Sequence, residues 1–114
     1  MAHAIEHAKN TVARWGGKVE DYLAVHQWLD ASKLHYADVR HRALRHHTAG
    51  IGDAEVLFGI LITNSLGKEV PVRYICEQHI KEDLGRIPSL QDWYEGIQVQ
   101  PWMLGQRLVK EEKL

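Results

Sequence analysis

The sequence predicts a mainly α fold: a compact multi-helix domain with a small two-stranded β-hairpin around residues 60–72. Apolar residues recur at helical spacing in most segments, and these segments end at Gly or begin beside Pro or Ser. One stretch differs, because Asn64–Lys68 is rich in turn residues and lies between two short runs rich in Val, Ile and Thr. A chain of 114 residues fits one core. We therefore expect residues 1–114 to form a single helical domain, with a frayed tail from about residue 106.

Two helices are expected in the N-terminal third of the chain. The first runs from Ala2 to about Arg14 and ends at Gly16-Gly17, a typical C-terminal glycine signal. The second runs from about Lys18 to Ser32 and presents an apolar stripe. The residues of that stripe are Val19, Tyr22, Leu23 and Leu29.

A third helix is expected from about His35 to Thr48, ended by Gly50 and Gly52, with a further helical stretch over Asp53–Gly59. After the hairpin, a helix is expected from Pro71 to Leu84, closed by Gly85. Ser89, with Asp92 three residues on, is typical of an N-cap and predicts a short helix through Trp93 and Tyr94. Beyond Pro101, the segment Trp102–Leu104 is expected to pack on the core.

The charge balance and the single cysteine limit the possible partners and location. Lys and Arg total 14 against 15 Asp and Glu, so the chain has no overall basic field, which argues against nucleic acid as a partner. Cys76 cannot form an internal disulfide, and no apolar run approaches the roughly 18 residues of a membrane span. We expect a cytoplasmic protein that does not bind a membrane.

Two His-x-x-x-Asp pairs lie on apolar helix faces. His26 and Asp30 fall within the apolar stripe of the second helix, and His79 and Asp83 fall within that of the Pro71–Leu84 helix. Residues four apart lie one turn over the other, so each pair can share a hydrogen bond or bind one ion. Buried polar groups cost several kcal/mol unless they are paired, so the four side chains require partners.

The predicted third helix supplies candidate partners. Its buried side is marked by Tyr36, Val39 and Ala43. His35 and His46 lie at one edge of that side, with Asp38 and Arg42 beside them, and His47 lies at the other edge; His41 and Arg45 point away. If the three helices pack together, the residues that could converge are His26, Asp30, His46, His79 and Asp83. His3 and His7, near the N-terminus, are expected on a solvated face and are left out.

Imidazole and carboxylate ligands together suit a divalent metal ion, which could be zinc, iron, manganese or nickel. Such an ion would activate water, so the leading hypothesis is a metal-binding protein and possibly a metal-dependent hydrolase. In that hypothesis Arg42 would hold a small anionic substrate, Glu82 would act as general base, and Asp38 would complete the catalytic set. Cys76 lies on an apolar face, as an inert buried thiol would.

The alternative hypothesis is a non-catalytic interaction module, which could be a homo-oligomer. In that case each His-x-x-x-Asp pair is a hydrogen-bonded pair that only fixes helix packing. A hydrolase predicts a stoichiometric metal and an adjacent cleft, whereas an interaction module predicts no metal and a flat apolar patch.

Several motifs resemble those of a small family of uncharacterised bacterial and phage proteins, a domain of unknown function. The motifs are Asp38-Val-Arg40-His41-Arg42, His46, and Glu77-Gln-His79 with Glu82-Asp83-Leu-Gly-Arg86, and the resemblance covers roughly residues 22–103. It implies no activity, but it implies that His41 matters although helical phase turns it outward. The His and Asp content is also similar to that of the HD-type phosphohydrolases, whose adjacent His-Asp dyad this chain lacks.

Overall fold

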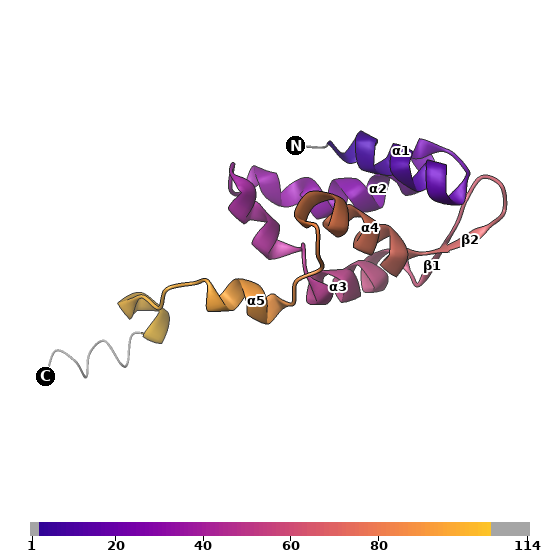
Figure 1. The fold of residues 1–114 in the computed structure, drawn as a ribbon. Coiled ribbons are helices and arrows are strands. Elements are labelled where there is room, and N and C mark those ends of the chain that lie inside the picture. Colours follow the sequence, from indigo (N-terminus) through magenta and orange to yellow (C-terminus); the bar gives the residue numbers. More distant parts are fainter. Residues whose placement is uncertain (1–2, 106–114) are drawn as a thin grey trace, which may run out of the picture.

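The computed structural model describes residues 3–105 and is built mainly of helices with one short hairpin (Figure 1). This confirms the predicted fold class. The elements in chain order are α1 (Ala4–Trp15), α2 (Val19–Asp30), the 3₁₀ helices η1 (Ala31–Leu34) and η2 (Val39–Leu44), α3 (Thr48–Phe58), β1 (Leu61–Thr63), β2 (Glu69–Pro71), α4 (Val72–Leu84), α5 (Leu90–Glu95) and the 3₁₀ helix η3 (Pro101–Leu104). The tail predicted to fray from about residue 106 lies outside the described residues.

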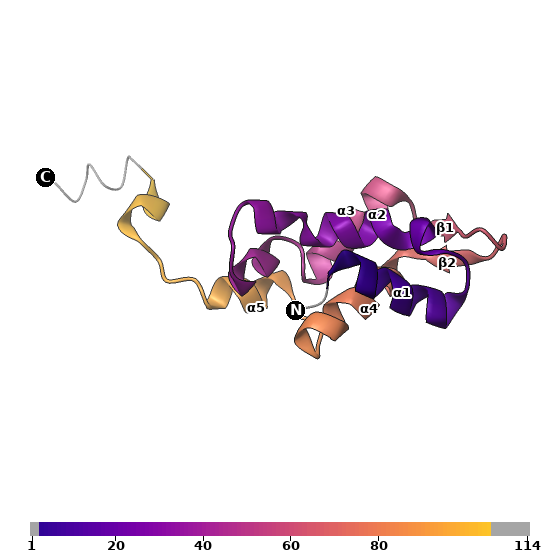
Figure 2. The ribbon, with the colours of Figure 1, turned by 90° about the horizontal axis from the view of Figure 1, so that it is seen from above.

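The helical body is formed by α1 to α4. α1 packs on α2, both contact α4, and α3 covers another side of α4 (Figures 1 and 2). The predicted apolar face of α4 is confirmed, because Val72, Ile75, Cys76 and Ile80 are all fully buried. Tyr22, Val25 and Leu29 of α2 pack into the same core. α4 is therefore the central element, and it carries both His79 and Asp83 into the interior.

The hairpin joins α3 to α4. β1 and β2 are antiparallel, with Ile62 opposite Val70, and β2 leads directly into α4 through Pro71. The side-chain oxygen of Asn64 accepts from the backbone N–H groups of Leu66 and Lys68 and holds the connecting turn together. The hairpin therefore fixes where α4 begins.

The helix predicted from His35 to Thr48 is wrong. Asp38 and His47 both have extended backbone conformations, and each caps the helix that follows it: Asp38 accepts from the N–H of Arg40, and His47 accepts from the N–H of Gly50. Local caps of this kind compete with a continuous α-helix. Within this segment the chain forms η2 and only the first residue of α3, and its predicted buried positions Tyr36 and Val39 are exposed.

α5 and η3 lead away from the helical body (Figures 1 and 2). Ser89 and Asp92 form the predicted capping box at the start of α5. The prediction that Trp102–Leu104 packs on the core is wrong, since Trp102 is 73% exposed and its two neighbours are also exposed. α5 still contacts the body, since Trp93 donates to the carbonyl oxygen of His46, and the chain leaves the body after α5, so η3 does not reach the core.

No helix within residues 3–105 is both long enough and apolar enough to cross a lipid bilayer.

We predict opposite effects for two glycines of α3. A Cβ on Gly50 would overlap the carbonyl group of Arg45, whereas a Cβ on Gly52 would meet no atom within 4 Å. Gly50→Ala should therefore lower the free energy of unfolding by about 2 kcal/mol or more, because the backbone before α3 must move. Gly52→Ala should raise it by up to about 1 kcal/mol, because Ala is the better helix former. Urea unfolding of both variants checks this, and equal effects would contradict it.

Candidate metal centre

Four side chains meet between α2, the start of α3 and α4. Asp30 is the last residue of α2, His46 lies just before α3, and His79 and Asp83 lie one turn apart on α4. Each offers one ligand atom, and the four atoms lie within 4.8 Å of one another. This group could hold a metal ion. We call these four residues the His2Asp2 group.

The N···O distances within the His2Asp2 group are short enough for the four atoms to share one ion. Nε2 of His46 lies 2.9 Å from Oδ2 of Asp83 and 3.7 Å from Oδ1 of Asp30. Nε2 of His79 lies 3.1 Å from Oδ1 of Asp30 and 3.2 Å from Oδ2 of Asp83. Ligands bound at 2.0–2.2 Å around a tetrahedral ion are separated by about 3.3–3.6 Å. The shorter contacts also fit N–H···O hydrogen bonds, so the same atoms can be joined by protons when no ion is bound.

The His2Asp2 group is almost completely removed from solvent. The side chains of His46 and His79 are 0% exposed, that of Asp83 is 4% exposed and that of Asp30 is 10% exposed. Two carboxylates at this depth need compensating positive charge, because an unpaired buried charge is strongly destabilising. An ion or protonated histidines can supply that charge.

Asp83 has the most charged surroundings in the group. Burial opposes its ionisation, but hydrogen bonds from His46, His7 and His79 outweigh burial and hold the pKa of Asp83 far below its usual value. A similar balance lowers the pKa of Asp30, where the hydrogen bond from His79 outweighs burial. Both carboxyl groups are therefore ionised at neutral pH and available as ligands.

The sequence analysis missed His7. It was expected in solvent but is completely buried, because α1 turns the face bearing His7, Ala8 and Thr11 toward α2 and α4. Nδ1 of His7 lies 2.7 Å from Oε1 of Glu82, and Nε2 lies 3.2 Å from Oδ1 of Asp83. Burial works against a charge on His7, but these two carboxylates outweigh it and raise the pKa of His7. The sequence signal available was the His7–Thr11 spacing of four beside Ala8.

Glu82 contacts His7 and does not face the four ligand atoms. Besides its bond to His7, its second oxygen accepts from Nε2 of Gln78 at 3.0 Å. The proposed role of Glu82 as general base remains a prediction, but its position here is that of a partner of His7.

His26 contacts a ligand residue and is not part of the four-residue group. Its Nδ1 lies 2.9 Å from Nδ1 of His79, and its Nε2 lies 2.8 Å from Oγ1 of Thr11. Burial, together with the neighbouring His79 and His7, lowers the pKa of His26 to about 3. Both ring nitrogens already have partners, so His26 contacts the ligand His79 and does not itself face the four ligand atoms.

The structure brings Arg42 to the group but not Asp38. Nη2 of Arg42 lies 3.7 Å from Oδ1 of Asp83, and its side chain is almost buried. Asp38 instead lies at the surface, where hydrogen bonds from the side chain and backbone of Arg40 lower its pKa to about 2. The placement of Asp38 near the site depended on the helix from His35 to Thr48, and the chain has no continuous helix there.

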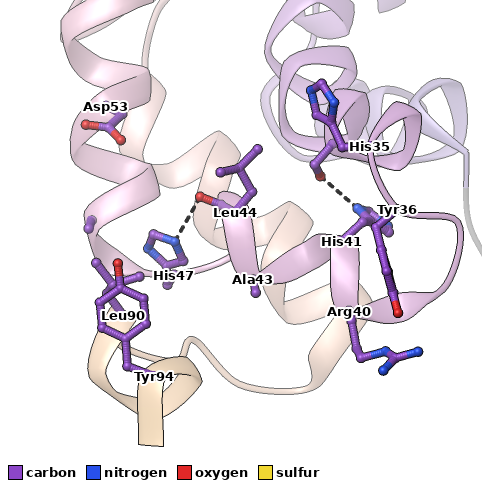
Figure 3. Close-up of a pocket in the computed structure, with 12 residues that line it drawn as sticks. His35, Tyr36, Arg40, His41, Ala43, Leu44, His47, Asp53, Leu90 and Tyr94 are labelled. Carbon is purple, nitrogen blue, oxygen red and sulfur yellow. Dashed lines mark hydrogen bonds between the residues drawn. The ribbon is translucent and has the colours of Figure 1, made fainter. Parts of the chain in front are cut away.

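A cavity of about 630 Å³ lies between η1, η2, α3 and α5 (Figure 3). His41 forms part of its wall, and its ring lies 6.0 Å from that of His46. Nδ1 of His41 lies 2.7 Å from Oγ of Ser32, while Nε2 has no hydrogen-bond partner among the described residues. His41 is only 3% exposed, so the prediction that it points outward was wrong.

His35 and His47, the other histidines of this region, lie outside the His2Asp2 group. His35 is exposed at the rim of the cavity, and His47 is buried as the N-cap of α3. Nε2 of His47 also lies 3.0 Å from the carbonyl oxygen of Leu44 (Figure 3). None of the four residues of the His2Asp2 group lines the cavity.

Acid should destabilise the metal-free protein. The lowered pKa values of His26 and His46, which burial causes, mean that the unfolded chain binds protons below about pH 6.5 that the folded protein does not. His7, with a raised pKa, is protonated in both states in that range and adds no slope. The lowered pKa of Asp83 adds a further loss of stability only below about pH 4.

We therefore predict that the free energy of unfolding of chelator-treated protein falls as pH decreases from 6.5 to 4. The slope should be about 1.4–2.8 kcal/mol per pH unit, which corresponds to one or two extra protons on the unfolded chain. Urea unfolding across this range measures it. The exposed His35 offers a control, because His35→Asn should keep the same profile. Stability that is constant or rises toward pH 4 would contradict the assignment of neutral buried histidines.

Cys76 should be unreactive in the folded protein. Burial, with a contribution from Glu55 and Glu77, raises the pKa of its thiol to about 12, so almost no thiolate exists at pH 8. A thiol reagent such as 5,5′-dithiobis(2-nitrobenzoic acid) should label the native protein far more slowly than the urea-unfolded protein. Rapid labelling of native protein would show that Cys76 is accessible and would reopen a role for the thiol.

The comparisons with known proteins give a family without a known function. The model of the family described as Domain of unknown function (DUF6915) matches residues 2–103. No curated protein and no solved structure matches the chain. The family match covers the motifs that carried the resemblance and extends to α1, which contains His7 and Thr11. The chain belongs to the DUF6915 family.

Proposed function

We propose that this protein binds one divalent metal ion through Asp30, His46, His79 and Asp83. The observation that supports this best is that two imidazole nitrogens and two carboxylate oxygens lie within 4.8 Å of one another in a nearly solvent-free site. Zinc is the ion that we expect, because it favours four ligands of this kind. Iron, manganese and nickel would need additional ligands to reach their usual coordination.

Binding of the ion would contribute to folding as well as to chemistry. The four residues come from three parts of the chain that are far apart in sequence, so an ion would connect α2, the start of α3 and α4. The ligands are not assembled in the unfolded chain, and the free energy of metal binding therefore adds to the free energy of unfolding.

A metal-dependent hydrolase is the second proposal. Arg42 beside Asp83 favours it, since its guanidinium Nε has no partner among the described residues and could hold a small anionic substrate. The cavity with His41 in its wall is a separate space, since neither Arg42 nor any residue of the His2Asp2 group lines it. Four protein ligands fill a tetrahedral ion, however, so activation of water requires one carboxylate to move away or a fifth position to open. We therefore rank metal binding ahead of hydrolysis.

The non-catalytic alternative is a homo-oligomeric interaction module. The exposed apolar side chains of Ile97, Val99 and Trp102, on the arm that leaves the body, favour self-association. Contacts with nucleic acid or with a membrane are not part of either proposal. Metal analysis separates the first two proposals from this one.

The decisive variant is His79→Ala, compared with His35→Ala. Untagged wild-type protein, purified without added metal, should contain about one metal ion per chain by elemental analysis. His79→Ala should lose this ion and melt at a lower temperature, because it removes a buried ligand and leaves Asp30 and Asp83 without compensation. His35→Ala, at an exposed position, should keep both the ion and the melting temperature.

Treatment with a chelator supplies the complementary test. It should remove the ion from wild-type protein and lower its melting temperature toward that of His79→Ala. If wild-type protein contains no metal and added zinc does not raise its melting temperature, the metal-binding proposal is wrong. The His2Asp2 group would then be a hydrogen-bonded cluster that fixes helix packing.

A further inference from the structure

We propose that α1, which supplies none of the four ligands, determines which nitrogen of His79 is free to bind the metal ion. Gln78, Thr11 and His26 form a chain of hydrogen bonds that places the ring proton of His79 on Nδ1 and leaves the lone pair of Nε2 facing the ion. Thr11 and His26 are thus positioning residues. This inference rests on the proposed metal function and assigns residues that support it.

The direction of the chain is set at Gln78. Its side-chain nitrogen lies 3.0 Å from the carbonyl oxygen of His7 and 3.0 Å from Oε2 of Glu82. Both of these atoms can only accept, so the amide N–H₂ of Gln78 must face them. The amide oxygen is therefore the atom directed at Thr11, from which it is separated by 2.8 Å.

Thr11 determines which nitrogen of His26 carries the ring proton. The Thr11 hydroxyl lies 2.8 Å from the amide oxygen of Gln78 and 3.0 Å from the backbone carbonyl oxygen of His7, and because both oxygens can only accept, the hydroxyl proton points toward them. The hydroxyl has a single proton and is therefore an acceptor toward His26 Nε2, 2.8 Å away. His26 must then carry its proton on Nε2.

His26 in turn determines that Nδ1 of His79 carries a proton. Both nitrogens of His26 contact only neutral groups or another imidazole, with no carboxylate within hydrogen-bond distance. With its proton on Nε2, His26 presents a lone pair at Nδ1, which lies 2.9 Å from Nδ1 of His79. Nδ1 of His79 donates to it. The remaining nitrogen of His79, Nε2, faces Asp30 and Asp83; when no ion is bound it donates a proton to these carboxylates, and an ion would take the place of that proton.

A second chain orients Asp83. Glu82 holds Nδ1 of His7, and Nε2 of His7 lies 3.2 Å from Oδ1 of Asp83. This leaves Oδ2 of Asp83 as the oxygen that faces His46 and His79. Gln78 contacts both chains, through its oxygen to Thr11 and through its nitrogen to Glu82. Outer partners of this kind orient metal ligands, and their removal costs about 10–100-fold in metal affinity.

The test compares Thr11→Val with Thr11→Ser, using zinc as the probe. Thr11→Val has nearly the same shape as wild type but cannot accept from His26, and it should bind zinc about 10–100-fold more weakly. Thr11→Ser keeps the hydroxyl and should bind zinc with wild-type affinity. Competition with a chromophoric chelator measures the affinity. Thr63→Val, an identical change at an exposed position of β1, controls for the substitution itself. Equal affinity in Thr11→Val and Thr11→Ser would overturn the proposal.

A second measurement applies even if Thr11→Val does not fold. Long-range ¹H–¹⁵N NMR spectra of metal-free wild-type protein report which nitrogen of each histidine carries the proton. His26 should be neutral and protonated on Nε2, and a proton on Nδ1 would overturn the proposal. If His26 has the expected form but wild-type protein binds no zinc, the hydrogen-bond chain is supported and the metal function alone is refuted.

Discussion

The carboxylate of Asp83 is the group around which the helical body is assembled. One of its oxygens faces His7 of α1 and Arg42, and the other faces His46 and the neighbouring His79. It therefore connects α1, the region before α3, and α4 through a single side chain. A buried anion with so many cationic or hydrogen-bonding neighbours cannot be left with one of them missing, because each removal leaves charge without compensation in a medium of low polarity.

This dependence explains the unusual composition of the interior. A core of Tyr22, Leu29, Ile75 and Ile80 surrounds a layer of polar side chains that is equally well buried. The histidines of this layer are stacked, with the ring centres of His7 and His79 3.7 Å apart. Two cationic rings at that separation would repel each other, so a proton on His7 depends on the carboxylates that surround it. The ionised Asp83 and Glu82 account for the charge on His7.

The helical framework and the buried polar residues of α2 and α4 that need partners followed from the sequence. The periodicity of α4 placed Ile75, Cys76 and Ile80 in the core, and the same phase correctly turned His79 and Asp83 inward. Three further signals were equally local. The turn residues Asn64–Lys68 predicted the hairpin, Gly85 predicted the end of α4, and the Ser89 cap predicted the start of α5. A periodic pattern specifies which face of a helix is buried, and that was sufficient for α2 and α4.

The positions of His7, His41 and Asp38 were decided by tertiary structure. His7 is buried because α1 packs on α2 and α4 with the face that carries His7, Ala8 and Thr11, whereas Ile5 of the same helix is exposed. Asp38 is exposed and His41 is buried, the reverse of what the phase of one continuous helix predicted. Side-chain caps at Asp38 and His47 begin new helices, so that phase does not apply to this segment. The sequence by itself determined which residues are buried within regular helices, since that depends on local spacing. Only the tertiary structure decided which of them meet, because the distance between Asp30, His46 and Asp83 depends on how α2, α3 and α4 pack.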